Sequence, residues 1–161
     1  MKEKGKENNF IMQAKKTGRI KDGKYAFIEY LAKDEWHKGK IENVLCKKKV
    51  QYYYNIGDIV FVKDYEYLDG SVGTKHLFVI IDKKFTAVPI EYWCMIISSN
   101  LNKLKYSQNI LLQKDNINGL NKDSVIKTDV IYNFLKEQIL FKVGEVDLDT
   151  INTYKEMFLN N

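Results

Sequence analysis

The chain has 161 residues, enough for one domain with an extension and for a buried core. Its composition, 45% apolar and 29% charged, is typical of a soluble globular protein, and no stretch approaches the ~18 consecutive apolar residues of a membrane span. The first residues, Met1 to Glu7, lack an apolar core and are not expected to form a signal peptide. Two isolated cysteines, Cys46 and Cys94, predict free thiols in the cytoplasm, with no zinc site, other metal or cofactor.

The net charge of +5 is unevenly distributed along the chain. Residues 1–50 contain 14 Lys and Arg against 7 Asp and Glu, whereas residues 51–161 contain 12 against 14. We therefore divide the chain into a basic, partly helical extension, 1–50, and a second region, 51–161. The basic excess indicates an anionic partner (RNA, DNA or an acidic protein), or alternatively a solvated surface rich in lysine.

The extension contains one clear helical pattern. Residues 1–20 have few apolar positions and predict an irregular, loosely packed lead. After Asp22, apolar residues recur at a spacing of four up to Trp36, which predicts a helix ending near Gly39, and a second short helix follows over 41–45. We expect the stripe that contains Trp36 to pack on the rest of the chain or on a dimer partner.

The second region reads as a series of short strands bounded by Gly, Asn and Asp, which is typical of a small barrel or twisted sheet. The expected strands are 56–63, 76–82, 85–90, 93–98, 109–113, 123–129 and 139–143. Between them we expect an exposed loop over 64–74, a polar loop over 100–108 and a helical turn or two over 130–138. Asp147 or Asp149 would cap a final helix that presents Ile151, Tyr154 and Phe158 on one face.

Four motifs carry a family resemblance. They are Gly57-Asp58-Ile59-Val60-Phe61-Val62, Gly73-Thr74-Lys75-His76-Leu77-Phe78-Val79-Ile80-Ile81, Ile96-Ile97-Ser98-Ser99-Asn100 and Gly119-Leu120-Asn121-Lys122-Asp123-Ser124-Val125-Ile126-Lys127-Thr128-Asp129. In this order and approximate spacing they resemble the MazF/PemK (Kid) family of toxin endoribonucleases, over roughly the C-terminal two thirds of the chain. The resemblance implies a mainly β fold, an SH3-like small barrel with a C-terminal helix, usually as a homodimer. It also implies single-stranded RNA as substrate and a cognate antitoxin, a protein or an RNA, bound near the 64–74 loop.

The same resemblance implies a set of catalytic residues: Lys75, Ser98, Lys127 and Asp129. RNA is cut without a metal when a ribose 2′-OH attacks the adjacent phosphate, which requires a base, an acid and groups that stabilise the developing charge. Lys75 stands where the family usually has arginine, and Ser98 matches a Thr or Ser that hydrogen-bonds a phosphate oxygen. Lys127 and Asp129 match a basic-x-acidic pattern and would share a strand face as acid and base, or form a surface salt bridge.

Four further residues are candidates for nucleic-acid binding: Tyr67, His76, Ser99 and Asn100. His76 would point away from Lys75 or lie half-buried, where a structural role is the alternative. Asn100 would read a base edge or make a turn, and Tyr67 would stack on an unpaired base or pack in the protein.

Two other functions fit the sequence. One is a non-enzymatic toxin of the CcdB type that binds a protein target such as gyrase, which the replacement of two family arginines by lysine favours. The other is an SH3-like RNA-binding module whose basic extension supplies the affinity. Arg19, the sole arginine of the chain, lies outside all four motifs.

Overall fold

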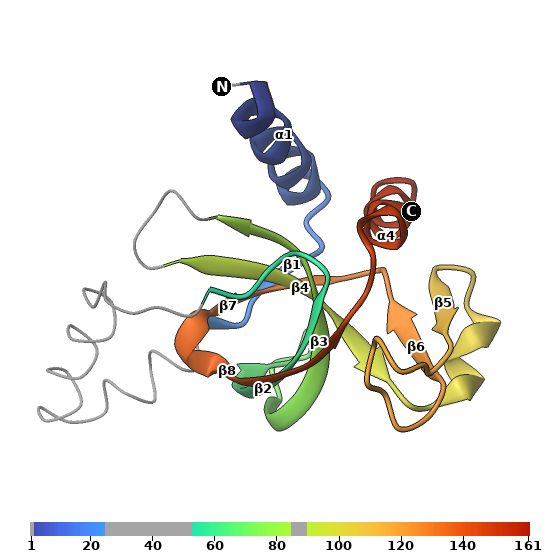
Figure 1. The fold of residues 1–161 in the computed structure, drawn as a ribbon. Helices are drawn as coiled ribbons and strands as arrows, with labels where there is room; N and C mark the ends of the chain where they lie inside the picture. The colour runs from blue at the N-terminus through green and yellow to red at the C-terminus, as the bar shows by residue number, and fades with distance from the viewer. Residues whose placement is uncertain (1, 25–52, 85–89) are drawn as a thin grey trace, which may run out of the picture.

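The computed structural model describes residues 2–24, 53–84 and 90–161 (Figure 1). The two predicted helices between residues 22 and 45, Cys46, and nearly all of the predicted strand 85–90 lie outside these residues. Within them, six strands of the sheet follow the order β1-β7-β4-β3-β2-β8, and β5 and β6 branch from it. Their bounds are β1 (Ile20–Asp22), β2 (Asp58–Glu66), β3 (Val72–Lys84), β4 (Glu91–Ser98), β5 (Asn109–Leu112), β6 (Ser124–Lys127), β7 (Ile131–Leu135) and β8 (Ile139–Glu145).

Strand β4 is the junction of the sheet. One of its edges pairs with β3, and the other pairs first with β7, over Glu91 to Cys94, and then with β6, at Ile97 and Ser98. Strand β5 pairs with the far edge of β6. Strand β4 leaves one partner for another before it ends, where the two parts of the sheet diverge (Figure 1). Ser98 is the last residue of β4.

Both faces of the sheet contribute to the core. One face packs against helices α1 (Lys2–Lys16) and α4 (Leu148–Leu159), where Ala14 and Phe158 are fully buried. The other face folds onto itself: the rings of Tyr65 on β2 and Phe134 on β7 lie 6.2 Å apart, although these strands are not hydrogen-bonded neighbours. The sheet therefore curls into a half-barrel, and the predicted mainly β small-barrel fold with a C-terminal helix is confirmed.

The C-terminal helix follows the sequence closely. Asp147 is its N-cap, and the carboxylate accepts a hydrogen bond from the Thr150 backbone N–H at 2.8 Å. Ile151, Tyr154 and Phe158 are its buried residues, as their spacing predicts. No helix among the described residues is long and apolar enough to span a membrane.

The backbone conformation at Gly57 explains why the first motif begins with glycine. Its φ is +98°, and a Cβ at this position would lie 2.4 Å from the Val146 carbonyl oxygen, so no other residue fits without a backbone shift. Its own carbonyl accepts from Val146 N–H at 2.8 Å, which joins the start of β2 to the end of β8. The adjacent Asp58 is buried and pairs with Lys142 at 3.2 Å.

Three predictions of local structure are wrong. Residues 1–20 are not irregular, because α1 spans Lys2–Lys16 and buries Phe10 and Ala14. Residues 131–135 form strand β7, not a helical turn, because this segment pairs with β1 on one edge and β4 on the other. All five of its side chains are buried. Within 130–138, only η2 (Lys136–Gln138), a 3₁₀ helix, is helical. The 64–74 loop is much shorter, because β2 runs to Glu66 and β3 begins at Val72.

Candidate active site

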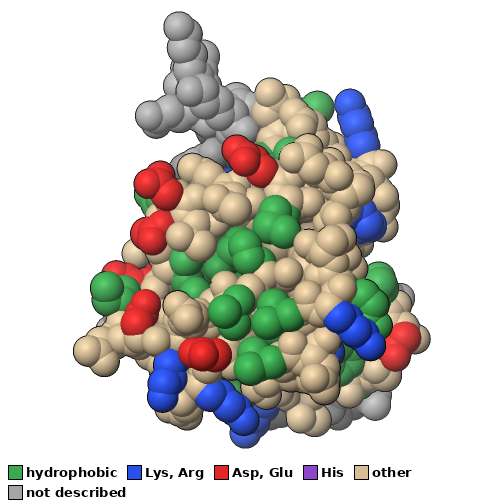
Figure 2. Space-filling model, turned by 90° about the vertical axis from the view of Figure 1, so that its right-hand side faces the viewer, with side chains coloured by type: hydrophobic (Ala, Val, Ile, Leu, Met, Phe, Trp, Pro, Cys, Tyr) green, Lys and Arg blue, Asp and Glu red, His purple; other side chains and the backbone are tan. Residues whose placement is uncertain are grey.

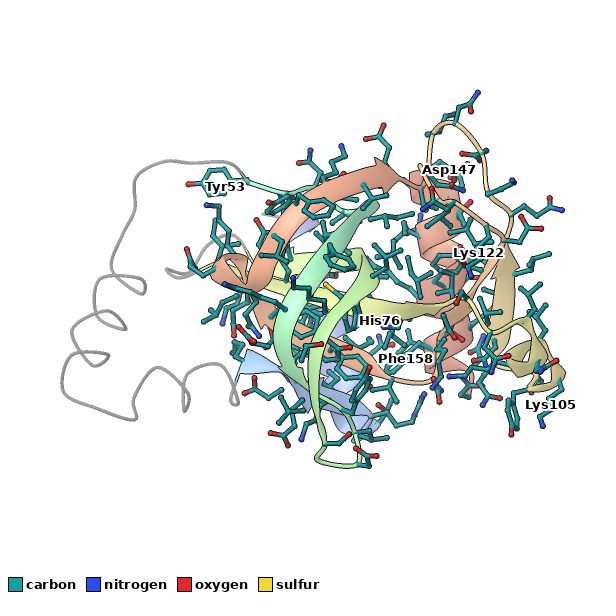
Figure 3. The ribbon with its side chains drawn as sticks, turned by 90° about the horizontal axis from the view of Figure 1, so that it is seen from below. Tyr53, His76, Lys105, Lys122, Asp147 and Phe158 are labelled. Carbon is teal, nitrogen blue, oxygen red and sulfur yellow. The ribbon has the colours of Figure 1, made fainter. Side chains whose placement is uncertain are left out.

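Three side chains from three strands meet on one face of the sheet. Ser98 on β4 stands opposite Val125 on β6, and alternation places Lys127 on the same face of β6 as Val125. His76 on β3 joins them, because its Nε2 lies 2.6 Å from the carbonyl oxygen of Ile97. The register of the sheet thus brings together the second, third and fourth motifs, with His76 labelled near the middle of Figure 3.

The environment of His76 keeps its imidazole neutral. Burial lowers the pKa of this side chain, and the positive charges of Lys103 and Lys127 lower the pKa further, against the opposing effect of the Ile97 carbonyl. A carbonyl oxygen only accepts, so Nε2–H is the donor and Nδ1 keeps its lone pair. His76 is therefore half-buried, as predicted, and presents one acceptor nitrogen close to two lysines.

Ser98 is nearly buried, and its hydroxyl oxygen accepts from the Asn100 N–H at 3.2 Å. The Asn100 side chain in turn accepts from Asn102 N–H at 3.1 Å and caps the 3₁₀ helix η1 (Leu101–Lys105). This geometry matches the turn alternative for Asn100, while Ser99 beside it is exposed. By fixing the start of η1, the turn brings Lys103 close enough to lower the pKa of His76.

The position of Asp129 differs from the one that the sequence predicts. Strand β6 ends at Lys127, so Asp129 lies in the turn that follows and does not share a strand face with Lys127. Its Oδ1 is buried and has no hydrogen-bond partner among the described residues, which is unusual for a carboxylate oxygen. Burial of the ring, and to a smaller extent the charge of Asp129, raises the pKa of Tyr132 to about 12.

Sequence reasoning missed Arg19. Its Nη1 donates to the backbone carbonyl of Asp129 at 2.9 Å, and its Nη2 donates to that of Phe158 at 2.6 Å. Its own carbonyl accepts from Ile131 N–H at 3.0 Å, at the start of the β1–β7 pairing. The one signal in the sequence is that Arg19 is the sole arginine among many lysines. Strand β1 has only three residues, too few to reveal a strand.

Lys75 and Tyr67 lie apart from the three converging side chains. Lys75 is exposed on the opposite face of β3, directly across from Lys63 on β2. Tyr67 is half-buried at the tip of the β2–β3 hairpin, where its hydroxyl lies 2.7 Å from that of Tyr65. The Tyr67 ring meets that of Tyr65 edge-on, which is the kind of contact that the packing interpretation of Tyr67 predicts.

The described residues contain no group of three or more His, Cys, Asp or Glu arranged to hold a metal ion. Cys94, the one cysteine among them, is a fully buried free thiol, and burial raises its pKa well above the usual value.

The half-barrel, the order of its motifs and the meeting of β3, β4 and β6 define a class of small toxin domain. Residues 55–158 match the model of the PemK-like, MazF-like toxin family of type II toxin–antitoxin systems. The chain belongs to this family, and its function is that of a toxin of a type II toxin–antitoxin system. Among curated proteins, none matches the chain.

Proposed function

We propose that the toxin is a metal-independent endoribonuclease that cleaves single-stranded RNA by attack of a ribose 2′-OH on the adjacent phosphate. The observation that carries the proposal is the meeting of His76, Ser98 and Lys127 on one face of the sheet in a member of this toxin family. Unpaired RNA is the substrate because only unpaired bases expose their edges to a protein.

Each group has a chemical part to play. Asp129, whose buried Oδ1 has no hydrogen-bond partner among the described residues, is the carboxylate assigned to take the 2′-OH proton, while the Lys127 ammonium stabilises the phosphorane or protonates the leaving oxygen. The Ser98 hydroxyl donates to a non-bridging oxygen, and Lys75 adds positive charge. His76, neutral with a free lone pair on Nδ1, accepts a hydrogen bond from the RNA, with Ser99 and Asn100 at the exposed rim.

The partners follow from the same proposal. The toxin acts in the cytoplasm and is neutralised by its antitoxin, which occupies the surface near the β2–β3 hairpin.

We also propose a homodimer. Figure 2 shows apolar side chains gathered on the face that contains β5 and η1, with charged side chains around them, a pattern typical of protein interfaces. The exposed apolar residues of this region are Leu101, Leu104, Tyr106, Leu111 and Ile117.

The test is cleavage of single-stranded RNA by the purified protein in EDTA. Wild type is expected to cut, while Lys127→Ala and Asp129→Ala lower the rate by at least ~100-fold, the usual range for an acid or base. Lys75→Ala and Ser98→Ala are expected to have smaller effects, because each removes only one contact to phosphate.

Lys114→Ala is the matched control, since Lys114 is exposed and lies outside the four motifs. Cleavage that both Lys127→Ala and Asp129→Ala retain would remove the assignment of the site. An intact RNA with wild type, together with inhibition of a protein target such as gyrase, would replace the nuclease with a protein-binding toxin.

A further inference from the structure

The outer face of β2, β3 and β8 is only partly covered. Ile59 and Val79, at one end of β2 and β3, are buried in the core beneath the helices. Two residues further along β2, Phe61 is only half-buried, and Lys63 beyond it reaches the solvent. These strands run side by side across the front of Figure 3, away from α1 (Figures 1 and 3).

Two aromatic rings form a flat apolar surface on this face. Phe61 and Phe141 stand opposite each other on β2 and β8, with ring centroids 5.4 Å apart and ring planes inclined by 23°. Phe141 is 53% exposed, although phenylalanine is among the residues most often buried. Phe141 lies on β8, the last strand in the order of the sheet, and its ring is open to a ligand.

Two lysines that make no salt bridge with any described residue lie next to the rings. Lys63 and Lys75 stand directly opposite each other, an arrangement of like charges that destabilises a sheet unless an anion is present. Neither makes a salt bridge within the part of the chain that the structure describes. Lys142 on β8, in contrast, is paired with Glu145 at 2.8 Å and Asp58 at 3.2 Å.

We propose that Phe61, Phe141, Lys63 and Lys75, here named the β2–β8 platform, bind single-stranded RNA on the face of the sheet opposite to His76. An unpaired base stacks on the ring of Phe141, and the phosphates next to it contact Lys63 and Lys75. Flat exposed rings interleaved with unpaired cations are the features that bind single strands without reading their sequence. The inference rests on the proposed function and extends it, because the platform adds a second contact surface for the same substrate, on the other face of β3 from His76.

The test is binding of a short single-stranded RNA that carries 2′-O-methyl groups throughout and so cannot be cut by 2′-OH attack. Fluorescence anisotropy would compare Phe141→Ala, Phe141→Leu and Phe141→Trp. Alanine and leucine are expected to weaken binding about tenfold, whereas tryptophan retains it, because only planar rings stack on a base. Lys63→Ala is expected to lower the slope of log K against log salt by about 0.7, the value for one phosphate of a single strand.

Two exposed residues away from the platform provide matched controls. They are Met12→Ala, on α1, and Lys122→Ala, in the turn before β6. Circular dichroism confirms that each variant is folded. If Phe141→Leu binds the RNA as wild type does, the platform is wrong. The platform is also wrong if the Phe141 variants change only the oligomeric state or only the binding of an acidic peptide. The first result would assign the face to a second copy of the chain, and the second would assign it to an antitoxin.

The two proposals fail separately. Cleavage of ordinary RNA by wild type, with unchanged RNA affinity in the Phe141 variants, leaves the nuclease intact and overturns the platform. Binding of the methylated RNA that depends on Phe141, without cleavage of ordinary RNA, supports the platform and overturns the nuclease.

Discussion

At the scale of single residues, Arg19 joins three parts of the molecule that are far apart in sequence. Its guanidinium binds the carbonyls of Asp129 and Phe158 and lies 4.2 Å from the centroid of the Phe158 ring. The planar fork of arginine suits two divergent acceptors, which the compact ammonium of lysine cannot reach together. Arg19 thereby fixes the backbone of the turn that carries Asp129, although it lies outside the residues matched by the family model.

Arg19→Lys is therefore expected to lower the free energy of unfolding by about 2 kcal/mol, the cost of losing a hydrogen bond from a charged donor. Urea unfolding followed by circular dichroism measures this loss. Lys16→Arg, the reverse exchange at an exposed position, is the control. A stability for Arg19→Lys equal to that of wild type would show that the two hydrogen bonds contribute nothing.

His76 predicts a dependence of stability on pH. Because folding lowers its pKa from 6.5, the unfolded chain binds the proton more tightly, and the free energy of unfolding falls as the pH drops below 6.5. His76→Gln, which keeps a donor for the Ile97 carbonyl and does not titrate, is expected to flatten the stability profile between about pH 5 and 6.5, above the range of ordinary carboxylates. Thermal unfolding of both proteins across this range measures the difference. Parallel profiles would contradict the buried, neutral imidazole.

At the scale of the elements, the sequence predicts those whose pattern is local. The strand that ends at Ser98 and the helix after Asp147 follow directly from a β-branched run and from a capping residue with an apolar stripe. The residues of strand β7 predict a helical turn because Ile131, Phe134 and Leu135 also fit a helical spacing. Only the pairing with β1 and β4 decides between strand and helix. The turn around Asp129 likewise depends on Arg19, 110 residues away.

The cap of α4 can be tested at this scale. Asp147→Ala is expected to cost about 1 kcal/mol of stability, since the Thr150 N–H loses its acceptor. Asp149→Ala provides the matched control, because Asp149 is an exposed residue of the first turn and not the N-cap. Chemical unfolding measures both. An equal loss in the two variants would point to the charge at the helix start and not to the capping hydrogen bond.

At the scale of the whole molecule, several large apolar side chains around β5 and η1 are exposed. Wild type is expected to be a dimer by light scattering, with about twice the chain mass of 18.9 kDa. Leu111→Lys, on β5, is expected to shift it toward the monomer, because a charge in an apolar interface is costly. Met12→Lys, on α1, is the control. A monomeric wild type, or a dimer that both variants leave intact, would contradict this interface.

The central claim is that a ribose 2′-OH of the substrate is the attacking group, which the ends of the cleaved RNA reveal most directly. A defined single-stranded RNA, incubated with wild type in EDTA and analysed by mass spectrometry, is expected to give fragments with 2′,3′-cyclic phosphate and 5′-hydroxyl ends. Fragments with 5′-phosphate and 3′-hydroxyl ends would mean that water attacks instead, and RNA that stays whole would mean that this toxin does not act on RNA.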